Sequence, residues 1–261
     1  MKNFKRIAAI LLAALLAVSL VACGAKTNTD DPAAANTGKK YIIASDNAFA
    51  PFEYLDTDSN TYVGIDMDVL AAIAADQKFE YEVQNVGFDA ALNQVQSDQA
   101  DAVIAGMTIT EERKLTFDFS EGYFDAGQIL VVPADSNIQS LEDLKGTNVA
   151  VKISTQGADY AQSVAGEYGF EITTYEDSPT MYQAVAQGTN AACFEDDPVV
   201  RYSIQSQNLD LKVVGDVINA KPYGFAVKRG ENAELIEMFN AGLANIKANG
   251  VYDEILAKYG Y

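Results

Sequence analysis

Arg113 is the residue of this chain best suited to holding an anion. It ends the segment Gly106-Met107-Thr108-Ile109-Thr110-Glu111-Glu112-Arg113, in which Thr110 fits the N-cap of a helix whose first amides would point into a cleft. A guanidinium fork beside such amides suits a carboxylate, which it can bind through two charge-assisted hydrogen bonds. The spacing also fits a surface arginine paired with Glu111 or Glu112, and the sequence alone leaves both interpretations open.

Asp196 and Asp197 stand directly after an apolar run over 191–194 and directly before Pro198. A carboxylate at the end of a buried strand could accept an ammonium group. Asp before Pro is also a common start of a helix. We therefore expect Asp197 to cap a helix and Asp196 to face a cleft.

Aromatic side chains accompany these charged groups. Phe49 and Phe52 flank Pro51, and Phe88 stands in a predicted short loop after a strand that ends at Val83. Aromatic walls would bury the carbon stem of a ligand, although Phe52 fits simple core packing better. An arginine for a carboxylate and an aspartate for an ammonium would suit a free α-amino acid, which the spacing permits without establishing.

The chain contains no histidine. This excludes Ser-His-Asp and Cys-His catalysis and most zinc sites, and it argues against a hydrolase. We predict no enzyme activity, no cofactor and no metal site. Of the two cysteines, Cys193 lies in an apolar run and is predicted to be a buried, inert thiol, whereas Cys23 lies near the N-terminus.

Short apolar runs alternate with helical patterns from residue 40 onward, which predicts an α/β protein with largely parallel sheets. The predicted strands cover 41–44, 79–83, 102–105, 148–152, 172–175, 191–194 and 223–227. The predicted helices cover 67–75, 89–97, 158–168, 180–187 and 231–248.

A weak internal echo suggests that this α/β pattern occurs twice. Segments 96–106 and 187–196 each read as a helix end, a tight turn and a buried strand that runs into a polar loop. In open α/β sheets, ligands bind beyond the carboxyl ends of the strands. We therefore expect two lobes around one cleft, surrounded by four polar loops at 46–52, 106–113, 154–157 and 195–198.

The first 22 residues have the composition of a secretory signal peptide. A basic start is followed by an apolar stretch over 7–21 and by small residues before Cys23. Leu20-Val21-Ala22-Cys23 resembles the bacterial lipobox, which implies cleavage before Cys23 and lipidation of its sulfur. Residues 23–39 lack apolar periodicity and read as a flexible tether.

Net charge constrains the partners of the mature chain. Removing residues 1–22 removes Lys2, Lys5 and Arg6, so the charge of −19 becomes −22. A surface this acidic argues against nucleic acid and against anionic lipid as binding partners.

Four stretches together resemble the extracellular solute-binding proteins of family 3, which serve ABC importers of polar amino acids. They are, in chain order, Asp46-Asn47-Ala48-Phe49-Ala50-Pro51-Phe52-Glu53-Tyr54, Gly64-Ile65-Asp66-Met67-Asp68-Val69-Leu70, the Gly106 to Arg113 segment running into Phe117-Asp118-Phe119-Ser120, and Glu195-Asp196-Asp197-Pro198. The resemblance spans residues 40–261.

This resemblance implies a two-lobed α/β fold of the periplasmic-binding-protein type (type II), with two hinge strands and the ligand in the cleft between the lobes. It implies hinge crossings near 123–128 and 220–224. Lobe 1 would comprise 40–125 and 222–261, and lobe 2 would comprise 126–221.

Roles of individual residues follow only from the resemblance. It implies that Arg113 binds the α-carboxylate, helped by the Thr108 and Arg113 amides. It also implies that Asp196 binds the α-ammonium, helped by the Gly106 carbonyl and the Thr108 hydroxyl. The other implied contacts are Thr155 and Gln156 to the carboxylate, and Phe49 and Phe88 on either side of the ligand's side chain.

The side-chain end of the ligand would meet Asp46, Lys152 and Glu195. Asp46 with Lys152 is similar to the glutamine-binding members, in which an acceptor and a donor bind the amide, so glutamine is the preferred prediction. Asp46 with Glu195 would instead suit arginine or lysine. Glutamate is disfavoured, because two carboxylates would face a third. A cyclohexadienyl or arogenate dehydratase-like enzyme on the same fold, with Glu195 as general acid, is a further alternative.

Partners and location are also implied by the resemblance. The partners would be a free amino acid, the permease and ATPase subunits of an ABC transporter, and the membrane through lipid on Cys23. The protein would be a monomer. A lipid-anchored carrier outside the cytoplasm is typical of cells with a single membrane, of the Gram-positive type.

Overall fold

The structure is a computed structural model that describes residues 38–261. The predicted signal peptide, Cys23 and the tether up to residue 37 lie outside the described residues. Within 38–261, no helix combines the length and the apolar character that crossing a bilayer requires.

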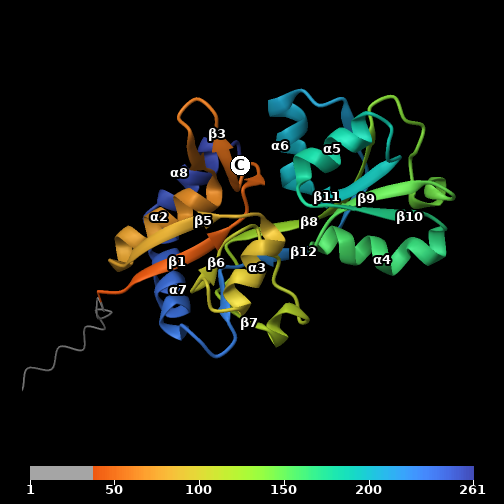
Figure 1. The fold of residues 1–261 in the computed structure, drawn as a ribbon. Helices are drawn as coiled ribbons and strands as arrows, with labels where there is room; N and C mark the ends of the chain where they lie inside the picture. Colours follow the sequence, from red (N-terminus) through yellow and green to blue (C-terminus); the bar gives the residue numbers. More distant parts are fainter. Residues whose placement is uncertain (1–37) are drawn as a thin grey trace, which may run out of the picture. The chain divides into compact units, whose positions relative to one another are not determined.

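Lobe 1 is built on a five-stranded sheet in which β1 pairs in parallel with β5 and β6, while β13 runs antiparallel to β6 and β7 (Figure 1). Its strands are β1 (Lys40–Ser45), β5 (Glu80–Asn85), β6 (Ala102–Val103), β7 (Phe117–Phe119) and β13 (Ala226–Lys228). Its helices are α2 (Ile65–Gln77), α3 (Phe88–Gln96), α7 (Ala233–Ala248) and α8 (Val251–Lys258), with the 3₁₀ turn η1 (Arg113–Leu115).

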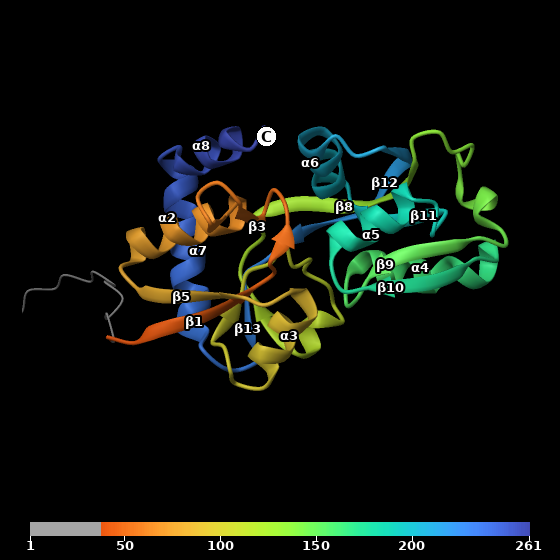
Figure 2. The same ribbon diagram turned by 45° about the horizontal axis from the view of Figure 1, so that its top comes forward.

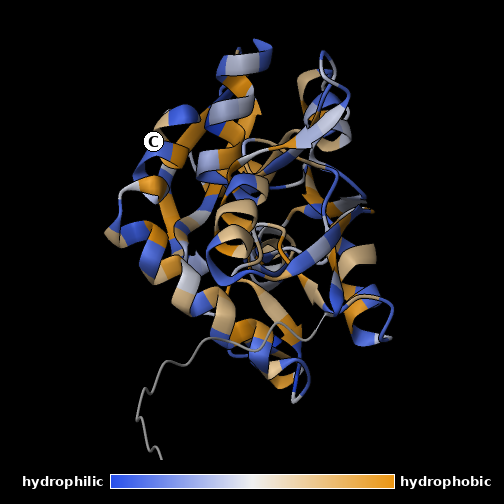
Figure 3. Cartoon of the chain, turned by 90° about the vertical axis from the view of Figure 1, so that its left-hand side faces the viewer, coloured by the Kyte–Doolittle hydropathy of each residue, from blue (hydrophilic) through white to orange (hydrophobic). Residues whose placement is uncertain are grey.

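Alternation along β1 explains how helices cover both faces of this sheet. Ile43 points into a core formed with α2, α7 and α8, whereas its neighbour Ala44 points into a second core formed with α3. Both side chains are fully buried, as expected for a strand covered on two sides. Figure 3 shows helices whose ribbons alternate between hydrophobic orange and hydrophilic blue, the pattern of amphipathic helices.

A small antiparallel sheet follows β1 and consists of β2 (Ala48–Phe49), β3 (Glu53–Asp56) and β4 (Thr61–Val63). Gly64 connects it to α2. A Cβ on Gly64 would lie 2.0 Å from the carbonyl oxygen of Phe52, and its φ of 139° also disfavours other residues. This close approach fixes the start of α2 against the loop that carries Phe49 and Phe52.

Lobe 2 is built on a second five-stranded sheet, in the order β10-β9-β11-β8-β12. Its strands are β8 (Phe124–Pro133), β9 (Asn148–Lys152), β10 (Glu171–Tyr175), β11 (Ala192–Asp196) and β12 (Leu211–Tyr223). Its helices are α4 (Gln156–Tyr168), α5 (Ser178–Ala186) and α6 (Asp197–Gln207), with the 3₁₀ turn η2 (Leu141–Leu144). Helix α4 covers one face of the sheet, and α5 and α6 cover the other. Cys193 is buried on the second face, and burial raises the pKa of its thiol well above the ordinary value.

The two long strands β8 and β12 connect the sheets. They pair antiparallel from Phe124 opposite Tyr223 to Pro133 opposite Leu211, and both run between the lobes in Figure 2. The predicted hinge crossings at 123–128 and 220–224 fall at one end of this ribbon. The predicted lobe boundaries at 125/126 and 221/222 therefore lie inside continuous strands and stay a prediction.

Three predictions of local structure in lobe 1 and at its junction with the hinge are wrong. The strand predicted over 223–227 is interrupted, because β12 ends at Tyr223 and β13 begins at Ala226. A Cβ on the intervening Gly224 would lie 2.8 Å from the Ile109 side chain, so the chain turns here between the hinge and lobe 1. The helix expected from Thr110 is only the 3₁₀ turn at Arg113–Leu115, and Phe88 is the first residue of α3 rather than part of a loop.

Candidate ligand-binding cleft

A polar cavity lies between the lobes and collects nearly all of the predicted site residues. Its lobe 1 wall consists of Phe49, Phe88, Ala105, Gly106, Thr108 and Arg113. Its lobe 2 wall consists of Lys152, Thr155, Gln156, Glu195 and Asp196. Among the predicted residues, Asp46 alone does not line the cavity; it lies behind Lys152. Ala105 lines the cavity but carries no polar group that a sequence pattern could have flagged.

Arg113 extends from η1 across the mouth of the cavity. Its guanidinium donates to the Thr108 carbonyl at 2.9 Å and to the Ser154 carbonyl at 2.8 Å, so it bridges both lobes. Burial lowers the pKa of Arg113, which Asp159 and Asp196 partly offset. The alternative of a surface arginine paired with Glu111 or Glu112 is wrong. Within residues 38–261, Arg113 forms no ion pair with either glutamate, and Glu111 pairs with Lys114 at 2.8 Å.

The backbone amide of Arg113 is engaged elsewhere. It donates to the Thr110 hydroxyl at 3.1 Å. Thr110 therefore caps this turn as a threonine at an N-cap would, although no long helix follows. The resemblance implied that the Arg113 amide donates to the ligand's carboxylate, but in this structure the amide is already hydrogen-bonded to Thr110. The guanidinium still lines the cavity.

Asp196 is the carboxylate opposite Arg113, at the end of β11. It is buried and accepts hydrogen bonds from Tyr223 and Gln128, which stand on the two hinge strands. Burial raises its pKa, against the effect of these two hydrogen bonds and of Arg113. The prediction that Asp197 caps α6 is wrong, because Asp196 occupies the N-cap and Asp197 pairs with Arg201 at 2.6 Å.

Lys152 forms an ion pair with Asp46 across the lobes, and the two side chains are only 2% and 1% exposed. The Lys152 ammonium lies 4.5 Å from the ring centroid of Phe49 and 5.6 Å from that of Phe88, so it sits against both aromatic walls. Burial lowers the pKa of Lys152, but Asp46 and Glu195 outweigh burial and the net shift is upward. The ammonium therefore stays charged in this buried position.

Glu195 is held by its own lobe. The hydroxyls of Ser178 and Tyr182 donate to one of its oxygens at 2.6 and 3.0 Å, and the Asp196 amide donates to the other at 2.9 Å. Burial and the neighbouring Asp196 raise the pKa of Glu195 to about 7, against the opposing effect of Lys152. Its charge therefore changes within the physiological range.

Thr155 and Gln156 begin helix α4 at the edge of the cavity. The Thr155 hydroxyl accepts from the Ala158 amide at 3.2 Å and donates to the Lys152 carbonyl at 2.7 Å, so it caps the helix. The Gln156 side chain donates to Asp159 at 2.7 Å. Both residues face the cavity, with their side-chain polar groups engaged locally.

A contact that sequence reasoning missed also joins the lobes. Ser154 has a left-handed φ of 62°, and its hydroxyl donates to Asp89 on α3 at 2.5 Å. Together with Arg113 and the Lys152–Asp46 pair, this contact holds the cleft nearly shut, since the cavity volume is about 10 Å³. A cavity of that size is roughly the room for one water molecule. Admission of an amino acid therefore requires these contacts to open.

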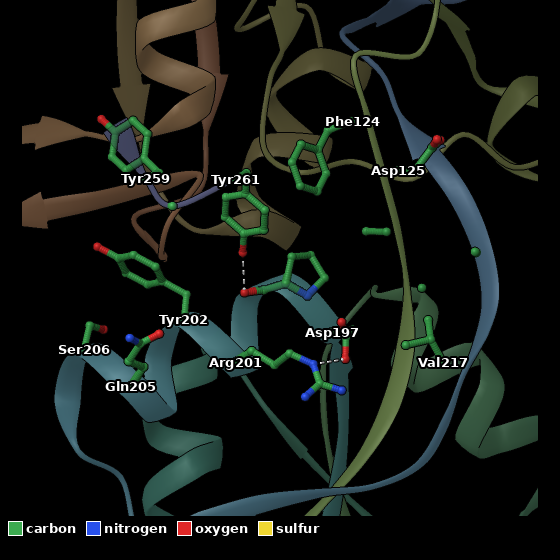
Figure 4. Close-up of a pocket in the computed structure, with 15 residues that line it drawn as sticks. Phe124, Asp125, Asp197, Arg201, Tyr202, Gln205, Ser206, Val217, Tyr259 and Tyr261 are labelled. Atoms are coloured by element: carbon green, nitrogen blue, oxygen red, sulfur yellow. Dashed lines mark hydrogen bonds and ion pairs between the residues drawn. The ribbon is translucent and has the colours of Figure 1, made fainter. Parts of the chain in front are cut away.

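A wider cavity, of about 810 Å³, lies beside the hinge strands and is shown in Figure 4. The Tyr261 hydroxyl donates to the Pro198 carbonyl at 2.9 Å along one side of it, and Arg201 pairs with Asp197. None of the predicted site residues lines it. Because its charged groups at α6 are paired with each other, we place the candidate site in the smaller interlobe cavity.

Comparisons with known proteins find a family model and several amino-acid-binding proteins. The family model described as bacterial extracellular solute-binding proteins, family 3, matches residues 41–261. A probable histidine-binding protein of Neisseria gonorrhoeae is 32% identical, covering 98% of this chain and 96% of its own. Two Bacillus subtilis proteins are also 32% identical: the arginine-binding extracellular protein ArtP, covering 96% of each chain, and the ABC transporter glutamine-binding protein GlnH, covering 98% and 97%.

Solved structures agree with the fold. An ancestral arginine-binding protein bound to arginine is 36% identical, with a TM-score of 0.79 over 85% of this chain and 98% of its own. Substrate-binding domain 2 of Lactococcus lactis GlnP, in its open conformation, is 43% identical, but its TM-score is 0.57 over 84% and 94%. The ancestral amino acid-binding protein AncCDT-1, a precursor of cyclohexadienyl dehydratase, is 32% identical, with a TM-score of 0.77 over 85% and 96%. The chain as a whole thus superposes better on the arginine-bound protein than on the open domain, although its sequence is more similar to the latter.

Proposed function

Because the chain belongs to the bacterial extracellular solute-binding proteins of family 3, we propose that it captures a free polar L-amino acid outside the membrane and delivers it to an ABC permease. The observation that carries the proposal is the cleft itself. Arg113 and Asp196, with opposite charges, line one interlobe cavity together with Phe49 and Phe88. This set complements a carboxylate, an ammonium and a carbon stem.

In this proposal, closure of the lobes is the functional step. Arg113 holds the α-carboxylate with the Thr108 amide, and Thr155 and Gln156 approach it from lobe 2. Asp196 holds the α-ammonium with the Gly106 carbonyl and the Thr108 hydroxyl. A ligand that touches both lobes stabilises the closed form by its differential affinity for it, and the permease would recognise that form.

Glutamine is the ligand that we favour. The Lys152 ammonium can donate to the oxygen of the glutamine side-chain amide, and the Asp46 carboxylate can accept from its nitrogen. A cationic amino acid is the alternative, supported by the carboxylates Asp46 and Glu195 near one lysine and by the aromatic walls, which already hold one cation. Relatives that bear the names of histidine, arginine and glutamine binders are equally similar to this chain.

Calorimetry of the purified protein against each free amino acid tests the proposal directly. We expect saturable binding of one polar amino acid, with glutamine the tightest. Tightest binding of arginine or lysine would establish the cationic alternative. Absence of heat with every amino acid would contradict the proposed function.

The pH dependence of Glu195 separates the two ligand classes. Glu195 is neutral below a pKa of about 7 and carries a negative charge above it. We therefore expect the ratio of arginine to glutamine affinity to rise between about pH 6 and about pH 8, because only the ionised carboxylate attracts a cation. Glu195→Gln should make the ratio independent of pH. A ratio that stays constant in the unsubstituted protein would exclude contact between Glu195 and the ligand's side chain.

We propose that the protein is not an enzyme. The relatives compared above are named as binding proteins. The raised pKa of buried Glu195 is a feature that a general acid would share, and it favours the dehydratase-like alternative. Incubation with prephenate or arogenate decides the matter, since formation of an aromatic product would overturn the binding-only proposal.

We also propose that a lipid on Cys23 anchors the carrier to the outside of a single-membrane cell and that it acts as a monomer. A tether of roughly sixteen residues would keep the cleft within tens of ångströms of the membrane and would raise its effective concentration at the permease. Fractionation of cells that express Cys23→Ala tests the anchor, because the protein should leave the membrane fraction.

A further inference from the structure

Glu53 and Asp66 form a buried acidic pair behind the candidate site. Glu53 begins β3, directly opposite Phe49 in the small sheet, and Asp66 lies in the first turn of α2. Both side chains are fully buried and lie within hydrogen-bonding reach of each other. The charged groups that face Glu53 are Asp66, Asp46 and Lys152, and the tyrosines Tyr123 and Tyr252 face Asp66.

If both carboxyls are ionised, three of the four carboxylate oxygens of this pair lack a hydrogen-bond donor among the described residues. Within residues 38–261, no N–H or O–H group donates to either oxygen of Glu53 or to Oδ1 of Asp66. Buried polar atoms without a partner are costly and rare. A proton on one carboxyl supplies the missing donor, because a protonated carboxyl can donate to its ionised neighbour.

We propose that Glu53 and Asp66 share one proton, carried on Glu53, and that the pair acts through it to position the cleft and the hinge. Asp66 connects the pair to both the cleft and the hinge. Its Oδ2 accepts from the Gly106 amide at 2.8 Å and from the Tyr123 hydroxyl at 2.8 Å. Gly106 lines the cleft and Tyr123 directly precedes hinge strand β8, so one carboxylate holds both.

The backbone conformation of Gly106 is tightly restricted. Its φ is +52°, and a Cβ at this position would lie 2.6 Å from the Phe49 ring. The backbone therefore passes directly under an aromatic wall of the cleft. The bond from its amide to Asp66 fixes where its carbonyl points, and that carbonyl is a proposed acceptor for the ligand's ammonium.

The direction of titration follows from burial. Burial, with Asp66 and Asp46 nearby, raises the pKa of Glu53 well above its ordinary value, and burial raises that of Asp66 to about 6. The folded protein thus retains a proton that the unfolded chain releases near the ordinary carboxyl pKa. Its stability should therefore fall as the pH rises from there through the raised pKa of Glu53.

Glu53→Gln tests the shared proton, because the glutamine amide donates at every pH. We expect the melting temperature of this variant, relative to the unsubstituted protein, to rise steadily from about pH 5 to about pH 9. Glu80→Gln, which removes an exposed carboxylate at the start of β5, should keep a constant difference. Parallel pH profiles for the Glu53→Gln variant and the unsubstituted protein would overturn the proposal.

Infrared difference spectroscopy detects the proton itself. The spectrum of the unsubstituted protein minus that of Glu53→Gln, at about pH 8, should contain the C=O band of a neutral carboxylic acid. A carboxylate band in its place would overturn the assignment of the proton to Glu53. Glu195 is present in both proteins, so its signal cancels.

Hydrogen exchange tests the positioning role. Glu53→Met keeps the length of the side chain but removes the donor, so the Gly106 amide should exchange at least about tenfold faster, equivalent to about 1.4 kcal/mol. In Glu53→Gln, the exchange rate of the Gly106 amide should stay within about threefold of that in the unsubstituted protein. The Ile104 amide, bonded to the Ala44 carbonyl at 3.1 Å, reports on general loosening of lobe 1. An unchanged Gly106 to Ile104 ratio in Glu53→Met would refute positioning. These measurements need no ligand, so their outcome is separate from that of the proposed function.

Discussion

Arg113→Ala should abolish most of the affinity for the amino acid that the protein binds. Within residues 38–261, the Arg113 guanidinium is the cation of the cleft that is not paired with a carboxylate, since it donates to the Thr108 and Ser154 carbonyls. Truncating one member of a buried charge pair typically costs about 2–5 kcal/mol. That corresponds to a dissociation constant raised roughly 30-fold to several thousand-fold, measurable by calorimetry.

Arg201→Ala is the matched control. Arg201 lies on α6 with a side chain that is 54% exposed, paired with Asp197 on the same helix. Its removal should change affinity less than about twofold, because exposed ion pairs contribute little. Arg113→Lys should fall between, since an ammonium keeps the charge but loses the bidentate fork. Wild-type affinity in Arg113→Ala, with the fold intact by circular dichroism, would remove Arg113 from the site.

Lys152→Met should destabilise the protein by about 3–5 kcal/mol, the usual cost of leaving a buried charge without its partner. The substitution keeps the aliphatic volume between the aromatic walls but leaves Asp46 and Glu195 buried without a cation. Because Lys152 holds down the raised pKa of Glu195, that carboxyl would then bind a proton more readily. The loss of stability should therefore be larger at about pH 8 than at about pH 5, measured by urea unfolding at each pH.

The double variant Asp46→Asn with Lys152→Met separates the pair from its surroundings. Because the neutral pair has no buried charge to compensate, the double variant should recover at least about 2 kcal/mol of the stability lost in Lys152→Met. Strictly additive effects of the two substitutions would show that the ion pair does not join the lobes in solution. Lys258→Met, which removes an exposed partner of Asp68, should cost less than about 1 kcal/mol.

Polar contacts between the lobes also explain why the candidate site is so small. Lys152 with Asp46, and Arg113 and Asp89 with Ser154, each join a lobe 1 residue to a lobe 2 residue. Among the groups in these contacts, Arg113, Lys152 and Asp46 are also proposed to meet an amino acid. A ligand must therefore exchange with internal partners, and the proposed specificity depends on the difference between the two sets of contacts.

Much of the fold could be predicted from periodicity. Strand 148–152 coincides with β9. The helix predicted at 67–75 lies inside α2, the one at 158–168 ends with α4, and the one at 89–97 extends one residue past α3. Apolar alternation and helical spacing act over a few residues, so they are readable locally. Predictions failed at Phe88, Thr110, Asp197 and 223–227. The break within 223–227 depends on the contact of Gly224 with Ile109, which is distant in the chain.

The candidate cleft, too, was predicted only in part from local sequence patterns. The motifs around Asp46, Gly106 and Glu195 indicated which loops would surround it, because the chemistry of an amino acid ligand restricts the residue types. Spacing alone could not distinguish a cleft arginine from a surface one. Only the folded chain separates the alternatives, since it directs Glu111 to Lys114 and Arg113 to the far lobe.

The sequence by itself determined the α/β architecture, the two lobes and most of the residues that line the cleft, because hydrophobic periodicity and a family motif are carried by neighbouring residues. Tertiary structure alone decided the pairings. Lys152 meets Asp46 across 106 positions, Ser154 meets Asp89 across 65, and the hinge tyrosine Tyr223 meets Asp196 across 27. In the sequence Arg113 is one of two adjacent cations in a polar segment, whereas in the folded chain its guanidinium joins both lobes. Which charge neutralises which is a property of three-dimensional proximity and burial, and no local pattern encodes either.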